Sequence, residues 1–133
     1  MKFLRSIVTA FFFISIALGV QEIAQAAEKD SIKKAKGGYT VEELFSKQKE
    51  LSGAKINVRG KVVKFSSGIM GKNWIHLQDG TGSAGTNDIT VTTNQTAQVG
   101  KIVLINGTLT TNKDFGFGYK YDVIIEEASI NAE

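Results

Sequence analysis

The chain has 133 residues, of which 16 are Lys or Arg and 13 are Asp or Glu, so its net charge at neutral pH is +3. This mild excess lacks the strong basic footprint typical of nucleic-acid-binding proteins. With no cysteine, the sequence excludes disulfide bonds and covalent attachment of a c-type haem. A single histidine leaves few groups for metal chemistry.

The N-terminal residues 1–26 have the three-part pattern of a secretory signal peptide. Lys2 and Arg5 precede an apolar run over residues 7–20, and the small residues at 24–26 suit a signal peptidase. We therefore expect a bacterial protein exported to the periplasm or the cell exterior, in contact with the membrane only transiently through this segment. An uncleaved N-terminal anchor is the alternative.

Residues 27–38, which follow, are polar, rich in lysine and end in two glycines. This composition favours a flexible leader that keeps the folded part away from the membrane. A basic arm that binds a partner is the alternative interpretation. The remaining residues, 39–130, have the length of one domain.

A helix is expected over residues 40–51. Thr40 and Glu43 fit a capping box, in which each side chain accepts a backbone N–H of the first turn. Apolar residues recur at helical spacing along one side, at Val41, Leu44, Phe45 and Leu51. Because such a stripe is stable only when it is covered, we expect this helix to pack on the structure that follows.

The rest of the chain has the period-two alternation of strands. We expect five strands, over residues 56–65, 73–79, 89–91, 101–110 and 119–128. Gly60 allows the first strand to bend and another backbone to approach closely. The run 102–105 is continuously apolar, which predicts a fourth strand covered on both faces.

Motifs in these strands resemble OB-fold domains, including the anticodon-binding domains of class II aminoacyl-tRNA synthetases. The resemblance lies in residues 58–62, in the run Trp-Ile-His-Leu-Gln-Asp-Gly-Thr-Gly at 74–82, and in residues 89–91. Residues 99–103 and 106–109 resemble the fourth strand of that fold. The resemblance covers residues 55–128. It implies an all-β, five-stranded Greek-key barrel, preceded by one N-terminal helix that plugs one barrel end.

The chain also looks similar to the small exported bacterial OB-fold proteins of the BOF family. Those proteins have a signal peptide, a helix that begins with Thr-Val and an Asp-x-Thr-Gly segment. Here these features correspond to Thr40-Val41 and to the segment at residues 79–82. The gap over residues 93–98 is too short for a helix, so the plugging helix is expected before the first strand.

No catalytic motif is present. The serines at 66–67 lack a Gly-x-Ser-x-Gly elbow, and no carboxylate pair has a readable spacing, so we predict no enzyme activity and no cofactor. His76 with Met70 or Asp79 is the only candidate metal site, and it falls short of the three or four ligands a stable site needs. The glycine-rich residues 80–85 join two strands, whereas a phosphate-binding loop is followed by a helix; a mobile connection is the simpler interpretation.

Binding across one barrel face is the hypothesis that remains. OB-fold domains generally bind on the second and third strands, between the loops after strands one and four. The resemblance places ten candidate ligand-binding residues there: Arg59, Lys61, Lys72, Trp74, His76, Thr90, Lys113, Phe115, Phe117 and Tyr119. The rings can stack on flat ligand groups and the cations can meet anionic ones. A small molecule, a glycan, a peptide and a protein partner are all compatible with this surface.

Two other functions stay open. The OB-fold resemblance implies an oligonucleotide ligand, although an exported chain meets little nucleic acid. A Lys-rich surface that docks onto an acidic partner suits an accessory protein of periplasmic redox complexes. The sequence also leaves open whether Trp74 and Phe117 are exposed or belong to the core.

Overall fold

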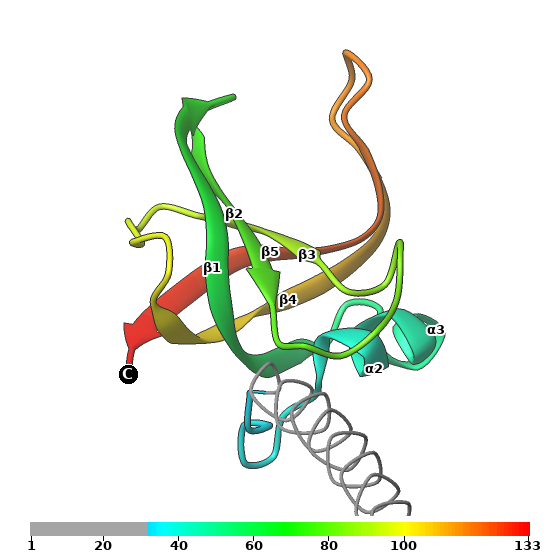
Figure 1. The fold of residues 1–133 in the computed structure, drawn as a ribbon. Coiled ribbons are helices and arrows are strands. Elements are labelled where there is room, and N and C mark those ends of the chain that lie inside the picture. The colour runs from blue at the N-terminus through cyan, green and yellow to red at the C-terminus, as the bar shows by residue number, and fades with distance from the viewer. Residues whose placement is uncertain (1–31) are drawn as a thin grey trace, which may run out of the picture. The chain divides into compact units, whose positions relative to one another are not determined.

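The computed structural model describes residues 32–133, so the predicted signal peptide and residues 27–31 lie outside the described residues. Five strands form a sheet that closes into a barrel in the order β1-β2-β3-β5-β4 (Figure 1). The strands are β1 (Lys55–Ile69), β2 (Lys72–Gln78), β3 (Ile89–Thr93), β4 (Ile102–Asp114) and β5 (Lys120–Ala132). Neighbouring strands are antiparallel except β3 and β5, which are parallel. The prediction of a five-stranded, closed, predominantly β structure is confirmed.

The inward face of β1 follows the predicted alternation. Ile56, Val58 and Val62 are buried in the core, and Gly60 lies on the same face. A Cβ atom at Gly60 would come within 2.6 Å of the Cγ of Leu77 on β2. Glycine therefore permits this close packing of β1 on β2, which confirms the close approach predicted at this position; the bend stays a prediction.

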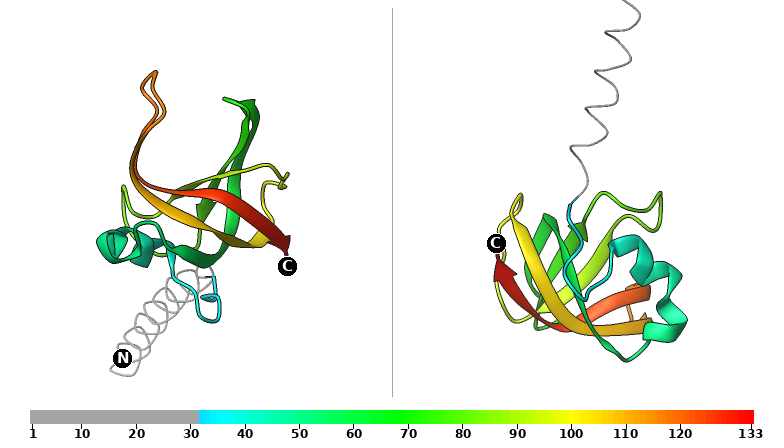
Figure 2. Two further views of the ribbon diagram at one scale, coloured as in Figure 1. Left: turned by 180° about the vertical axis from the view of Figure 1, so that it is seen from behind. Right: turned by 90° about the horizontal axis from the view of Figure 1, so that it is seen from below.

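The hairpins β1–β2 and β4–β5 extend further than the sequence predicts. Their ladders continue to the pairs Ile69↔Lys72 and Asp114↔Lys120, beyond the last buried residues. Both hairpins project from the same end of the barrel (Figures 1 and 2). The hydropathy pattern missed these extensions because backbone hydrogen bonds, rather than buried side chains, define them.

Strand β4 corrects one expectation. Val103 and Ile105 are buried, whereas Ile102 and Leu104 are only half-buried. The strand is thus fully covered on one face, and the prediction of cover on both faces is wrong. A continuous apolar run cannot report what lies against each face, because that depends on distant parts of the chain.

Two short helices occupy the end of the barrel opposite the hairpin tips (Figure 1). These are α2 (Val41–Ser46) and α3 (Gln48–Leu51), which replace the single helix expected over residues 40–51. The capping box is present: Thr40 N–H donates to Glu43 Oε1 over 3.0 Å, and Glu43 N–H donates to Thr40 Oγ1 over 3.1 Å. Val41, Leu44 and Leu51 join the hydrophobic core of the barrel. Neither helix in residues 32–133 has the length or apolar character needed to cross a membrane.

The segment Asp79–Gly82 fastens α2 to the barrel. Asp79 is 2% exposed, and its carboxylate accepts Val41 N–H over 2.8 Å, Thr81 N–H over 3.0 Å and the Thr81 hydroxyl over 2.6 Å. In return, Thr81 Oγ1 accepts Glu42 N–H, and Gly82 N–H donates to the Glu42 carboxylate. These hydrogen bonds hold the start of the glycine-rich segment against the helix. The mobility predicted for residues 80–85 stays a prediction.

Residues 32–38, the described part of the predicted leader, lie against the barrel. Ile32 N–H donates to the carbonyl of Asp79, and Ala35 is buried. Lys34 forms an ion pair with Glu43 at 2.8 Å. The flexibility predicted for residues 27–38 stays a prediction, and these contacts hold their second half beside α2.

Candidate functional site

Four aromatic rings meet near the outer part of the hairpins, and we call them the aromatic base: Trp74 from β2, Tyr121 from β5, and Phe115 and Tyr119 from the turn that joins β4 to β5. The Trp74 ring centroid lies 5.2 Å from that of Phe115 at an interplanar angle of 69°, an edge-to-face contact. Its centroid lies 6.1 Å from that of Tyr119 and 5.9 Å from that of Tyr121. Such pairs contribute about 0.5–1.5 kcal/mol each beyond the area they bury.

Trp74 lies where the sequence places it, on the outer face of β2, but it is not open to a ligand. Its side chain is 5% exposed, and its indole N–H donates to the carbonyl of Ile69 over 2.8 Å. The hairpin carrying Phe115 and Tyr121 covers it. Burial, with a smaller contribution from Tyr119, raises the pKa of Tyr121 above its usual value. The rings of the base therefore use much of their stacking surface on one another.

Phe117 differs from the rings beneath it, because its side chain is 97% exposed. It stands at the hairpin tip with φ at +55°, between Gly116 and Gly118, which also have positive φ. The tip is held by hydrogen bonds from Phe115 N–H to the Tyr119 carbonyl and from Gly116 N–H to the Asp114 carboxylate. A defined turn thus presents one aromatic side chain to solvent.

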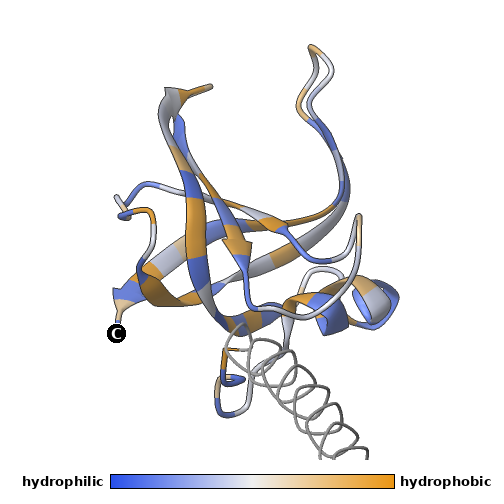
Figure 3. Ribbon diagram, in the orientation of Figure 1, coloured by the Kyte–Doolittle hydropathy of each residue, from blue (hydrophilic) through white to orange (hydrophobic). Residues whose placement is uncertain are grey.

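The β1–β2 hairpin ends in a similar way. Met70 is 40% exposed and has φ at +52°, next to Gly71 at +73°. Hydrophobic colouring appears at the tips of both hairpins (Figure 3). Two apolar side chains, Met70 and Phe117, are therefore displayed from the same end of the barrel.

The predicted residues His76 and Thr90 form a cross-strand pair on β2 and β3. His76 Nδ1 lies 2.8 Å from Asp88 Oδ1, and the Gln78 side chain donates to the other oxygen of the same carboxylate. Asp88 thus orients the imidazole. Residues 32–133 contain no group of three or more His, Cys, Asp or Glu side chains that could hold a metal ion.

The predicted cations do not gather in one place. Lys113 lies 5.2 Å from the centroid of Phe115 and 3.7 Å from the Glu126 carboxylate, so it lies beside the aromatic base. Arg59, in contrast, donates to the Glu133 carboxylate and to the backbone carbonyls of residues 33 and 34. Its guanidinium lowers the pKa of Glu133. Lys61 is exposed on β1, where it pairs with Gln78 and Ile102.

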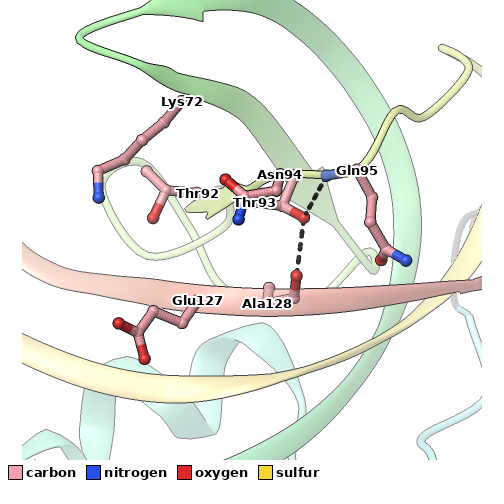
Figure 4. A pocket seen from close by; sticks show the side chains of 7 residues that line it. All are labelled: Lys72, Thr92, Thr93, Asn94, Gln95, Glu127 and Ala128. Atoms are coloured by element: carbon pink, nitrogen blue, oxygen red, sulfur yellow. Dashed lines mark hydrogen bonds between the residues drawn. The ribbon is translucent and has the colours of Figure 1, made fainter.

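Lys72 borders a separate cavity of about 430 Å³ beside the end of β3 (Figure 4). The lining residues are Lys72, Thr92, Thr93, Asn94, Gln95, Glu127 and Ala128. Most of them were not candidate residues, because their proximity depends on how β3 and β5 align. Tyr121 was missed as well, although the alternation of aromatic residues along the hairpin points to it.

A comparison of the sequence with protein-family models gave no match, and a comparison with curated proteins gave none either. The function is therefore inferred from the site itself.

Proposed function

We propose that this chain is an exported, non-enzymatic binding module of the OB-fold type, which docks onto a protein partner through its hairpin end. The strand order, with a parallel β3–β5 pair and a helix covering one barrel end, supports the OB-fold assignment. The signal-peptide pattern at residues 1–26 supports export.

The exposure of Phe117 is the observation that carries this proposal. A large ring exposed on a well-ordered turn gains about 1.5–3 kcal/mol when a partner covers it. Aromatic anchors that fill a pocket dominate the binding energy of many protein interfaces. Because hydrogen bonds from Phe115 N–H and Gly116 N–H already close the turn, less conformational freedom is lost on binding than in an open loop. Met70, on the neighbouring hairpin, supplies a second apolar contact.

Single-stranded nucleic acid is less well supported as the ligand. Base stacking needs open ring faces along the outer side of the barrel, and Trp74, the ring on that floor, is covered. Lys113 is already near Glu126, and the exposed carboxylates of Asp114 and Asp122 flank the hairpin. These anions oppose a phosphate backbone. The alternative function, an accessory protein of periplasmic redox complexes, would make a subunit of such a complex the protein partner.

Site-specific photo-crosslinking in intact bacterial cells tests the proposal. A benzoylphenylalanine residue replaces Phe117 in one variant and Val99 in a control variant; Val99 is 61% exposed and lies in the β3–β4 loop. We expect a discrete protein adduct from position 117 and none from position 99. Equal labelling at both positions, labelling of lipid, or no adduct at position 117 would contradict the proposal.

A titration with a fluorescent oligothymidylate at two salt concentrations tests the alternative. Oligonucleotide binding would weaken with salt, with a slope of about −0.7 per phosphate neutralised. We expect no measurable binding at either concentration. If the oligonucleotide binds with a salt-dependent affinity and Phe117→Ala abolishes this binding, the ligand of the hairpin end is nucleic acid and not a protein.

A further inference from the structure

The cavity beside Lys72 has the features of a ligand site, and it is lined by neither Phe117 nor Met70. It lies between the start of β2, the end of β3 and a distorted part of β5 (Figure 4). We propose that it binds a small zwitterion that carries both an ammonium and a carboxylate group, of the size of an α-amino acid or a dipeptide.

Strand β5 is distorted at Glu127. On the β3 side, the register passes from Val91↔Ile125 to Thr93↔Ala128, so β5 has one extra residue. The register with β4 shifts at the same place. Glu127 has φ at +52°, and residues 126 and 128 pair with neighbouring strands on either side of it. It is therefore the extra residue of a β-bulge, a feature that redirects side chains and is frequent near functional sites.

Glutamate is an unfavourable residue for this backbone conformation. The left-handed region suits glycine, and a side chain with a Cβ atom is strained there. Among residues 32–133, the Glu127 carboxylate forms no ion pair and accepts no side-chain hydrogen bond that offsets the strain. The bulge places the Glu127 carboxylate at the edge of the cavity.

Lys72 supplies the opposite charge. Its side chain lines the same cavity, and it forms no ion pair with Glu127 or with any other carboxylate in the described part of the chain. In Figure 4 the Lys72 ammonium and the Glu127 carboxylate lie on opposite sides of the space in front of Thr92. A cation and an anion thus face the cavity without neutralising each other.

Thr92 provides an independent sign of a missing partner. It is 1% exposed, and its Oγ1 is the one buried side-chain polar atom in residues 32–133 without a hydrogen-bond partner. The adjacent Thr93 is fully satisfied, because its hydroxyl donates to the Ala128 carbonyl over 2.7 Å and accepts Gln95 N–H over 3.0 Å. Buried hydroxyls normally have partners. We infer that a ligand in the cavity that Thr92 lines would supply one.

These groups select a zwitterion over simpler ligands. A lone anion that pairs with Lys72 would face the Glu127 carboxylate, and a lone cation would face the Lys72 ammonium. A neutral sugar would leave both charges unpaired. A molecule with both charges satisfies both, and Thr92 and Asn94 line the same cavity.

An NMR titration tests this proposal. The full chain is expressed, and the purified protein is titrated with L-alanyl-L-alanine as the probe. We expect saturable shifts of the backbone amides of residues 92–95 and 127–128 at millimolar concentrations. Acetate, methylammonium and glucose should bind at least tenfold more weakly. Absence of saturable shifts, or binding of glucose or of either half-ion as tight as that of the dipeptide, would overturn the proposal.

Three variants separate a binding role from a structural one. Lys72→Gln and Glu127→Gly should each weaken dipeptide binding at least tenfold, whereas Glu127→Gly should leave the melting temperature unchanged or raised. Thr92→Val should raise the melting temperature and weaken binding, because it removes the unpartnered hydroxyl. If all three variants bind the dipeptide as tightly as the wild type does, the cavity is not the binding site.

A fourth variant is the matched control. Lys55 lies with Glu127 on a second cavity, of about 370 Å³, on the other side of the bulge. Lys55→Gln should leave dipeptide affinity unchanged. If it weakens binding as much as Lys72→Gln, the carboxylate serves the other cavity and the assignment is wrong.

Discussion

The two ends of the barrel differ in how their polar and apolar groups are used. At the helix end, Asp79 accepts three hydrogen bonds and the apolar stripe of α2 is buried. At the hairpin end, Phe117 and Met70 are exposed, and both have the positive φ that glycine would adopt more easily. The helix end is built for stability, while the hairpin end keeps exposed and strained features that folding does not need. The start of the glycine-rich segment at residues 80–85, which the sequence predicts to be only a connection between strands, contributes to the helix end.

Among the substitutions that test this difference, removal of the Asp79 carboxylate should have the largest effect on the free energy of unfolding. Asp79→Ala leaves the N–H groups of Val41 and Thr81 without their partner, and we expect a loss of about 4 kcal/mol in the free energy of unfolding. Asp114→Ala, at the hairpin end, removes one exposed hydrogen bond and should cost about 1 kcal/mol or less. Urea denaturation measures both. Equal losses would mean that the two ends do not differ as described.

Within the hairpin end, the aromatic base and the tip should also differ. Trp74→Ala removes a buried ring and should lower the free energy of unfolding by about 3 kcal/mol. Phe117→Ala removes an exposed ring and should change it by about 0.5 kcal/mol or less. Thermal and urea unfolding of both variants provide the measurement. A stable Trp74→Ala protein would show that the base is not packed.

The helix end should lose stability in acid. The ion pair with Lys34, together with the Thr40 N–H, lowers the pKa of Glu43 from 4.5 to about 2. Because the folded pKa is below the unfolded one, this contribution is complete above about pH 4.5, declines as the pH falls and is lost below about pH 2. The melting temperature of Lys34→Met should therefore depend less on pH in this range than that of the wild type. If the melting temperatures of Lys34→Met and the wild type change with pH in parallel, the Lys34–Glu43 ion pair does not have this role.

The smallest expected effect concerns the strained tip. Asparagine tolerates a positive φ better than phenylalanine does, so Phe117→Asn should leave stability unchanged or raise it by about 0.5 kcal/mol. The same variant should lose the partner contact. A clear loss of stability would indicate that Phe117 has a structural role.

Local signals were sufficient to predict much of the fold. The capping box at Thr40 and Glu43 and the alternation along β1 depend on residues close in sequence, and both are present in the structure. The break at Lys47 between α2 and α3, and the hairpin extensions, have no comparable sequence signal.

The candidate site was harder to predict because it depends on distant neighbours. The outer-face position of Trp74 follows from alternation, but its burial depends on Phe115 and Tyr121 from another hairpin. Arg59 is occupied by Glu133, which is 74 residues away in the sequence, so the sequence gives no sign of this ion pair. The exposure of Glu127 to the cavity depends on the register of β5 against two strands at once.

The fluorescence of Trp74, the only tryptophan of the chain, tests the central claim most directly. If the aromatic base is packed and only the tip is presented, acrylamide should quench Trp74 far less than in the urea-unfolded chain. Phe117→Ala should leave this protection unchanged, and Tyr121→Ala should reduce it. Quenching of the folded protein as efficient as that of the unfolded chain would contradict the account, since Trp74 would then be an open stacking surface.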